Sequence, residues 1–111
     1  NMERSGAPVS GPVGPDLFVA PLIDKALAAC MSLGADLRRD GYTAEIAYAA
    51  GSPRAQLRRA NNANARVTII LGERELAAGT VAIKPMDGGK QTEVSLAAVR
   101  QTVASLLDEH A

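Results

Sequence analysis

Short apolar runs alternate with amphipathic stretches from residue 16 onward. The run Leu17–Ala20 is apolar throughout and is followed by a proline, which predicts a short buried strand. Beyond it, apolar side chains recur at helical spacing until Gly41, where we expect a first helix to end. The inward positions of that helix would be Ile23, Ala26, Leu27, Cys30, Gly34 and Leu37. The stretch Thr43–Tyr48 alternates enough to predict a second strand.

The middle of the chain predicts a second helix and the most apolar strand. Ser52 followed by proline is a typical helix start, with a hydroxyl at the N-cap and proline at the first helical position. We expect this helix to reach Ala63, with Leu57 and Ala60 facing inward. The segment Arg66–Leu71 is rich in β-branched residues and predicts a third strand.

After Gly72 the elements become shorter. The segment Glu73–Ala78 predicts one helical turn. Two strands, Thr80–Lys84 and Gln91–Val94, are expected on either side of a glycine-rich hairpin turn. Ser95 would then cap a last helix. The apolar side of that helix would comprise Leu96, Val99, Val103, Leu106 and Leu107.

The order of the elements, β-α-β-α-β-β-β-α, predicts the fold class. Two crossover helices imply three parallel strands, and right-handed crossovers place the helices on both faces of the sheet. The hairpin adds two strands at one edge. We therefore predict a three-layer α/β sandwich, with a five-stranded mixed sheet and three helices. Residues 1–15 are rich in proline and glycine and predict a linker, which leaves 16–111 as one domain.

Composition narrows the class of protein. The 111 residues are 47% hydrophobic, and 12 basic side chains balance 12 acidic ones, which argues against a protein that coats nucleic acid non-specifically. Aromatic residues make up only 3%, too few for a broad platform that stacks several bases. No apolar run approaches the roughly 20 residues of a membrane span. The expected location is cytoplasmic.

The residue types needed for catalysis or cofactor binding are sparse. The single cysteine, Cys30, falls on an apolar helix stripe and is expected in the core. The single histidine, His110, is next to last in the chain, so no nucleophile–histidine pair can be assembled. No glycine follows the first strand, where a phosphate-binding loop would need it. We therefore predict no catalytic, metal or cofactor site in this chain.

Arginines gather in one interval that contains no acid. Between Glu45 and Glu73 there is no carboxylate. The interval holds Arg54, Arg58, Arg59 and Arg66, with several asparagines close by. Arg54 and Arg58 are four apart and would share a helix face, and the planar guanidinium suits phosphate and base edges. The two interpretations are a solvated helix face and a site that touches a short stretch of RNA.

Two charged residues flank the fourth predicted strand. Glu75 precedes the strand, and Lys84 lies at its far end. A carboxylate can accept from base amino groups and a lysine can donate to base carbonyls, so the pair could read bases at a sheet edge. Alternatively, they are surface charges or an ion pair worth under about 1 kcal/mol.

The stretch ILGERELAAGTVAIK, together with FVAPL at the first strand and QLRRAN in the second helix, resembles the anticodon-binding domain of class II aminoacyl-tRNA synthetases. Within that group the chain is most similar to the C-terminal domain of the histidyl enzymes, over Leu17 to Leu107. The fold of that family is the five-stranded sheet with three helices predicted above. The helix start Ser52-Pro53-Arg54 departs from the family, which often has lysines there.

The resemblance implies recognition of a tRNA anticodon arm. On matching positions, Glu75 and Lys84 would lie near anticodon bases, and Arg54, Gln56, Arg58 and Arg59 near the stem-loop. It also implies that histidine, ATP and Mg²⁺ are bound by a separate catalytic domain of a parent enzyme, itself a homodimer.

Two other function classes stay open at this point. A paralogue of the same fold could serve as a regulatory or subunit-interaction module without reading tRNA, because a fold does not determine function. A small flavodoxin-like domain is disfavoured by the missing glycines after the first strand.

Overall fold

The computed structural model describes residues 14–108, and the expected linker over 1–15 and His110 lie largely or wholly outside them. The strands are β1 (Leu17–Pro21), β2 (Ala44–Ile46), β3 (Val67–Leu71), β4 (Thr80–Pro85) and β5 (Thr92–Ser95). The helices are α1 (Leu27–Arg39), α2 (Pro53–Asn62), α3 (Glu73–Ala78) and α4 (Val99–Asp108). Two 3-10 turns, η1 (Asp24–Ala26) and η2 (Leu96–Ala98), lead into α1 and α4.

The five strands form one mixed sheet in the order β2-β1-β3-β4-β5. β1 is parallel to β2 and to β3, because α1 and α2 each return the chain to the same end of the sheet. β4 runs antiparallel to β3, and β5 runs antiparallel to β4, as short connections allow. This arrangement confirms the predicted mixed five-stranded sheet.

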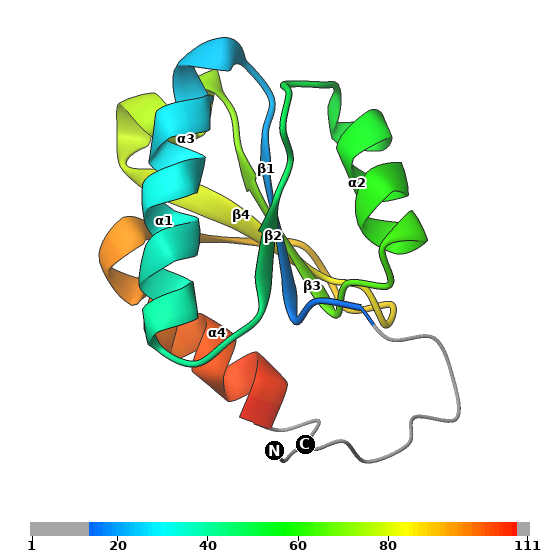
Figure 1. Cartoon of the computed structure of the whole chain (residues 1–111). Coiled ribbons are helices and arrows are strands. Elements are labelled where there is room, and N and C mark those ends of the chain that lie inside the picture. The colour runs from blue at the N-terminus through cyan, green and yellow to red at the C-terminus, as the bar shows by residue number, and fades with distance from the viewer. Residues whose placement is uncertain (1–13, 109–111) are drawn as a thin grey trace.

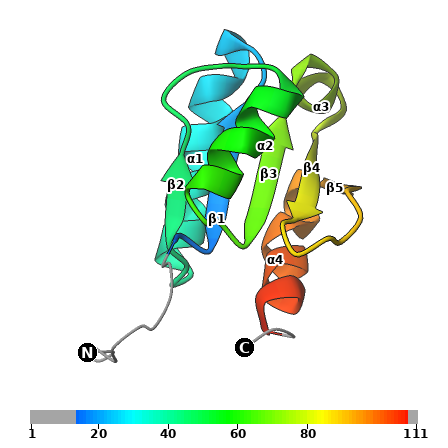
Figure 2. The same cartoon turned by 90° about the vertical axis from the view of Figure 1, so that its right-hand side faces the viewer.

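Helices cover both faces of the sheet. Figure 1 shows α1 and α4 on one face and α2 alone on the other, and Figure 2 shows α2 lying across the strands. Side chains along β1 point alternately to the two faces of the sheet. Leu17 and Val19 belong to the hydrophobic cluster that lies under α1 and α4. Phe18 and Ala20 belong to the smaller cluster under α2. The three-layer sandwich is therefore confirmed.

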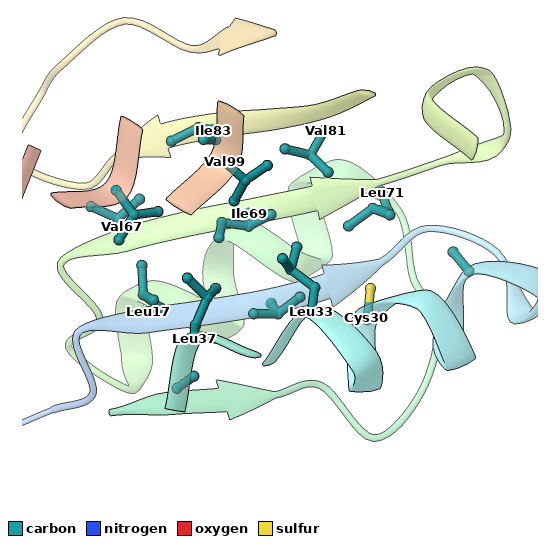
Figure 3. Close-up of a cluster of buried hydrophobic side chains, with 14 of the residues drawn as sticks. Leu17, Cys30, Leu33, Leu37, Val67, Ile69, Leu71, Val81, Ile83 and Val99 are labelled. Carbon is teal, nitrogen blue, oxygen red and sulfur yellow. The ribbon is translucent and has the colours of Figure 1, made fainter. Parts of the chain in front are cut away.

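The larger cluster, under α1 and α4, is the main core (Figure 3). Ile69 of β3 is fully buried at its centre. Cys30 of α1 is buried there too, as predicted, and burial raises the pKa of its thiol to about 12. The thiol is therefore protonated at neutral pH and acts as a small apolar side chain.

Several predicted details were wrong, each for a local reason. The structure has a fourth helix, α3, where a single turn was expected, and the first helix begins with the 3-10 turn η1. In α2 the innermost polar position is Gln56, whereas Leu57 is only partly buried. Leu96 is 45% exposed because it lies in the 3-10 turn before α4, where helical spacing does not apply.

The edge strand β2 has three residues, half the predicted length. Arg38, near the end of α1, holds it by donating from Nε and Nη2 to the carbonyl oxygen of Ala44, at 2.9 and 2.6 Å. Two donors of one guanidinium that share a carbonyl oxygen restrict both the position and the orientation of the Arg38 side chain relative to β2. The end of α1 and the start of β2 are therefore tied together.

A second arginine joins α1 to α4. Arg100 of α4 donates from Nε to Asp40 Oδ2 at 2.6 Å, and its Nη2 contacts the other carboxylate oxygen. This hydrogen-bonded pairing lowers the pKa of Asp40, while the carboxylate in turn raises the pKa of Arg100. A carboxyl whose pKa is lower in the folded state stabilises the fold above its unfolded pKa of about 3.9.

The pairing predicts an acid-sensitive share of stability. We expect Asp40→Asn to have a lower free energy of unfolding than the wild-type chain at pH 6. This difference should shrink as the pH falls below about 4 and through the lowered pKa of Asp40 in the folded state. Urea unfolding at a series of pH values measures the difference. In an Arg100→Ala background, Asp40→Asn should produce a much smaller pH-dependent difference, since only the attraction of Arg39 is left to lower the pKa of Asp40, and an equal difference there would contradict the assignment.

Candidate nucleic-acid interface

Helix α2 presents two arginines to solvent. Its start is as predicted, since Ser52 is the N-cap and its Oγ accepts from the backbone N–H of Ala55 at 3.1 Å. From that start, Arg54 and Arg58 fall one turn apart on the exposed face. Among residues 14–108, neither of these two arginines forms an ion pair with a carboxylate. Their charge is therefore available to an anionic partner.

The other arginines of the acid-free interval are held by the protein. Arg66 faces Asp16 at 3.6 Å and donates to the carbonyl oxygen of Leu107 at 3.4 Å, so it joins β3 to the neighbourhood of α4. Arg59 donates from Nη1 to Gln56 Oε1 at 2.9 Å. Arg59 and Arg66 are thus held by other groups of the protein, whereas Arg54 and Arg58 have no carboxylate partner among the described residues.

Gln56 lies inside the protein, against the expectation that it contacts RNA. Its side chain is fully buried, and Nε2 donates to the carbonyl oxygens of Pro21 at 2.6 Å and Ala49 at 3.0 Å. With both donors and Oε1 engaged, the amide has a single orientation. Gln56 therefore joins α2 to the end of β1 and to the loop after β2, and it has no surface to offer a partner in this conformation.

Glu75 helps to cap α3, the helix in whose first turn it lies. Its Oε1 accepts from the backbone N–H of Gly72 at 2.9 Å, and only 11% of its side chain is exposed. A Cβ at position 72 would lie 2.8 Å from this oxygen, so a side chain there would push the carboxylate away from the N–H that it caps. Gly72 and Glu75, three positions apart after the central strand, thereby form a capped strand-to-helix turn.

The outer oxygen of Glu75 belongs to a small charged group that the sequence did not reveal. Arg74 Nη2 lies 3.6 Å from Glu75 Oε2 and 3.2 Å from Glu93 Oε1. Glu93, on β5, also accepts from Thr80 Oγ1 at 2.6 Å. These residues come from α3, β4 and β5, and only the sheet pairing brings them together.

Lys84 lies apart from Glu75. It is near the end of β4, opposite Thr68 of β3, whereas Glu75 precedes the start of β4. Its Nζ donates to the carbonyl oxygen of Gly89 at 3.3 Å. An ammonium group has three donors, so two have no partner among the described residues and could bind a ligand. The structure thus does not bring Glu75 and Lys84 into one contact.

The fold and the match to a known family agree. Residues 16–106 match the family described as anticodon binding domain. The chain belongs to this family. As an anticodon-binding domain it carries the capped turn after β3 and the arginine-bearing helix α2, both within the segments that resemble that family.

Relatives of this anticodon-binding domain are found in longer proteins. The histidine–tRNA ligase of Caldanaerobacter subterraneus subsp. tengcongensis is 33% identical over 92% of this chain, and that of Oleidesulfovibrio alaskensis is 42% identical over 81%. The chain spans only 24% and 22% of these two relatives. It therefore corresponds to about a quarter of their length.

Solved structures share the fold. The histidyl-tRNA synthetase from Nostoc sp. PCC 7120 matches with a TM-score of 0.79 at 23% identity, over 86% of this chain and 23% of that one. The histidyl-tRNA synthetase of S. aureus matches with a TM-score of 0.74 at 25% identity, over 86% of this chain and 28% of that one.

Residues 14–108 contain no group of three or more potential metal ligands. Nor does any helix among these residues have the length and apolar character to cross a membrane.

Proposed function

We propose that this anticodon-binding domain contacts the anticodon arm of histidine tRNA, as part of a histidine–tRNA ligase. The observation that carries the proposal is the exposed face of α2, where Arg54 and Arg58 have no carboxylate partner among residues 14–108. Unpaired guanidinium groups on a neutral domain favour phosphate contacts at a defined place. Relatives that carry the same domain are histidine–tRNA ligases, which supports the choice of tRNA.

The proposed contacts divide by chemistry. Phosphate contacts position the RNA and carry no sequence information, and we assign them to Arg54 and Arg58. Base contacts determine which RNA sequence is bound. We assign them to the remaining two donors of Lys84 and to Glu75 Oε2, since Glu75 Oε1 is occupied by the helix cap. Arg59, a residue of the same helix, is held by its hydrogen bond to Gln56 and adds a third positive charge to α2.

The rest of the ligase would lie outside this chain. We propose that the linker over residues 1–15 leads to a catalytic domain, and that this domain binds ATP with Mg²⁺ and joins histidine to its tRNA. Dimerisation through that catalytic domain and a cytoplasmic location belong to the same proposal.

A binding experiment separates base reading from phosphate contact. We expect Lys84→Ala to reduce the preference for the histidine anticodon over a changed anticodon by roughly tenfold, because a lost base contact is worth about 1–3 kcal/mol. Equilibrium binding of the 111-residue chain to synthetic anticodon arms measures the preference.

The matched control is Arg58→Ala. This variant should weaken binding to both anticodons alike and make the dependence of affinity on salt shallower by about one counterion. Equal losses across anticodons for Lys84→Ala would contradict base reading by Lys84. Absence of any RNA binding by the wild-type chain would contradict the proposed function and favour a domain that serves only protein contacts.

A further inference from the structure

A small hollow lies between α2 and the edge strand β2, on the face of the sheet that α2 covers. Its volume is about 150 Å³. It is lined by Phe18, Glu45, Ile46, Ala47, Tyr48 and Arg59. Phe18 and Ala47 are buried and form an apolar base, whereas Glu45 and Tyr48 are exposed. The hollow therefore combines an apolar base with an acidic, an aromatic and a basic side chain.

Tyr48 leaves its ring in solvent. It is 85% exposed, more than Met31 at 55% or Leu96 at 45%, the other large apolar side chains exposed among residues 14–108. Aromatic rings usually bury much of their area, and burial of that area is favourable. A ring left this open beside a hollow offers a planar face to a ligand.

Arg59 is held next to this ring. Its guanidinium carbon lies 6.0 Å from the centre of the Tyr48 ring, at cation–π distance. The hydrogen bond from Nη1 to Gln56 Oε1 fixes the side chain, and Gln56 is itself locked by two backbone carbonyls. A Cβ at Gly51 would come within 3.1 Å of Arg59 Nη1, so the glycine leaves room for the guanidinium.

We propose that this hollow binds one unpaired nucleobase of the RNA. The inference rests on the proposed function and names a contact that it does not assign. The base stacks on the Tyr48 ring beside the guanidinium of Arg59, as unpaired bases do on aromatic and arginine planes. Arg59 donates to a ring nitrogen or carbonyl of the base, and the Glu45 carboxylate accepts from an exocyclic amino group. The preferred base therefore has both an acceptor and an amino group.

RNA is favoured over a protein partner by the charges nearby. Arg54 and Arg58 lie on the same helix and have no carboxylate partner among the described residues, so a polyanion whose base enters the hollow has its backbone close to free cations. A nucleobase can satisfy the Glu45 carboxylate by donating from its exocyclic amino group, whereas the carboxylates of an acidic peptide have no donor to offer.

The test uses two RNAs and two variants at one position. Tyr48→Ala should weaken binding of a synthetic histidine anticodon arm, whose loop is unpaired, by about tenfold. It should leave the affinity for a fully paired duplex of the same stem unchanged. Tyr48→Phe keeps the ring and should bind both RNAs like the wild-type chain. Because Tyr48 is exposed, neither change should impair folding, which thermal unfolding verifies.

The outcomes separate this inference from the proposed function. If Tyr48→Ala binds the loop RNA as tightly as the wild-type chain, or weakens loop and duplex alike, stacking in the hollow is wrong and the proposed function stands. If the wild-type chain binds neither RNA, both fall together. Fluorescence of 2-aminopurine placed at successive loop positions should be quenched at one position, and this quenching should disappear in Tyr48→Ala but persist in Tyr48→Phe.

Discussion

Replacing Ile69 with alanine is expected to lower the free energy of unfolding by about 2–5 kcal/mol, the largest effect of any single change considered for this domain. Ile69 is at the middle of β3, which is itself the middle strand of the sheet. It pairs with Val19 on one side and Ile83 on the other, and Val99 of α4 lies over the same face (Figure 3).

The size of the effect follows from the site's surroundings. Ile69 is fully buried, and strands and helices enclose it, so the neighbours can only partly fill the space left by the lost methyl groups. Small domains have total stabilities of about 5–15 kcal/mol, so the variant would be close to its folding limit. A loss of 1 kcal/mol shifts the melting temperature of a domain this size by about 4–8 °C.

Calorimetry or urea unfolding measures this loss, and Ile69→Val is the matched control. The control removes one methylene group and should cost only about 0.5–1.5 kcal/mol. Equal losses for the two variants would show that the site relaxes freely, contrary to the enclosed position described here.

Replacing Gln56 with leucine is expected to lower stability by about 1–3 kcal/mol and also to weaken RNA binding. Leucine is similar in size but cannot donate, so the carbonyl oxygen of Ala49 loses the side-chain donor and that of Pro21 keeps only the longer bond from Gly51, at 3.3 Å. Arg59 loses its anchor at the same time, which frees its guanidinium from the position beside Tyr48. A structural residue is thus coupled to the surface that we propose for RNA.

The matched control for Gln56→Leu is Asn61→Leu, an exposed position on the same helix to which no RNA contact is assigned. It should change stability by no more than about 0.5 kcal/mol, because surface substitutions of this kind are close to neutral. Urea unfolding gives the stability, and binding of the anticodon arm gives the coupling. Wild-type stability in Gln56→Leu would mean that the buried amide contributes nothing net.

The pattern of apolar positions predicted the fold well because each element buries one side of itself. The strand Val67–Leu71 is buried at every position, as expected for a strand covered on both faces. The start of α2 was predictable because Ser52 and the proline after it act locally. Such signals are contained within a few neighbouring residues, so the sequence alone displays them.

The site was harder to predict, because its contacts join distant residues. Gln56 was expected on the surface, yet its partner Pro21 is 35 positions away and only the folded sheet brings the two together. Glu75 was expected as an exposed charge, and its role as a cap depends on the close approach that Gly72 permits. The sequence does not indicate the contact between Tyr48 and Arg59, since that contact depends on the packing of α2 beside β2.

The short strand β2 and its contact with Arg38 affect the tendency of the domain to aggregate at high concentration. A sheet edge presents unpaired N–H and C=O groups that can recruit a strand from another molecule, and short edge strands limit this hazard. Thr43 and Ala47 direct their backbone bonds toward β1, so the carbonyl of Ala44, between them, points away from the sheet. Arg38 occupies that carbonyl with two hydrogen bonds. The outer edge of β2 therefore has one acceptor fewer with which to start intermolecular β-pairing, and this protects the domain against aggregation.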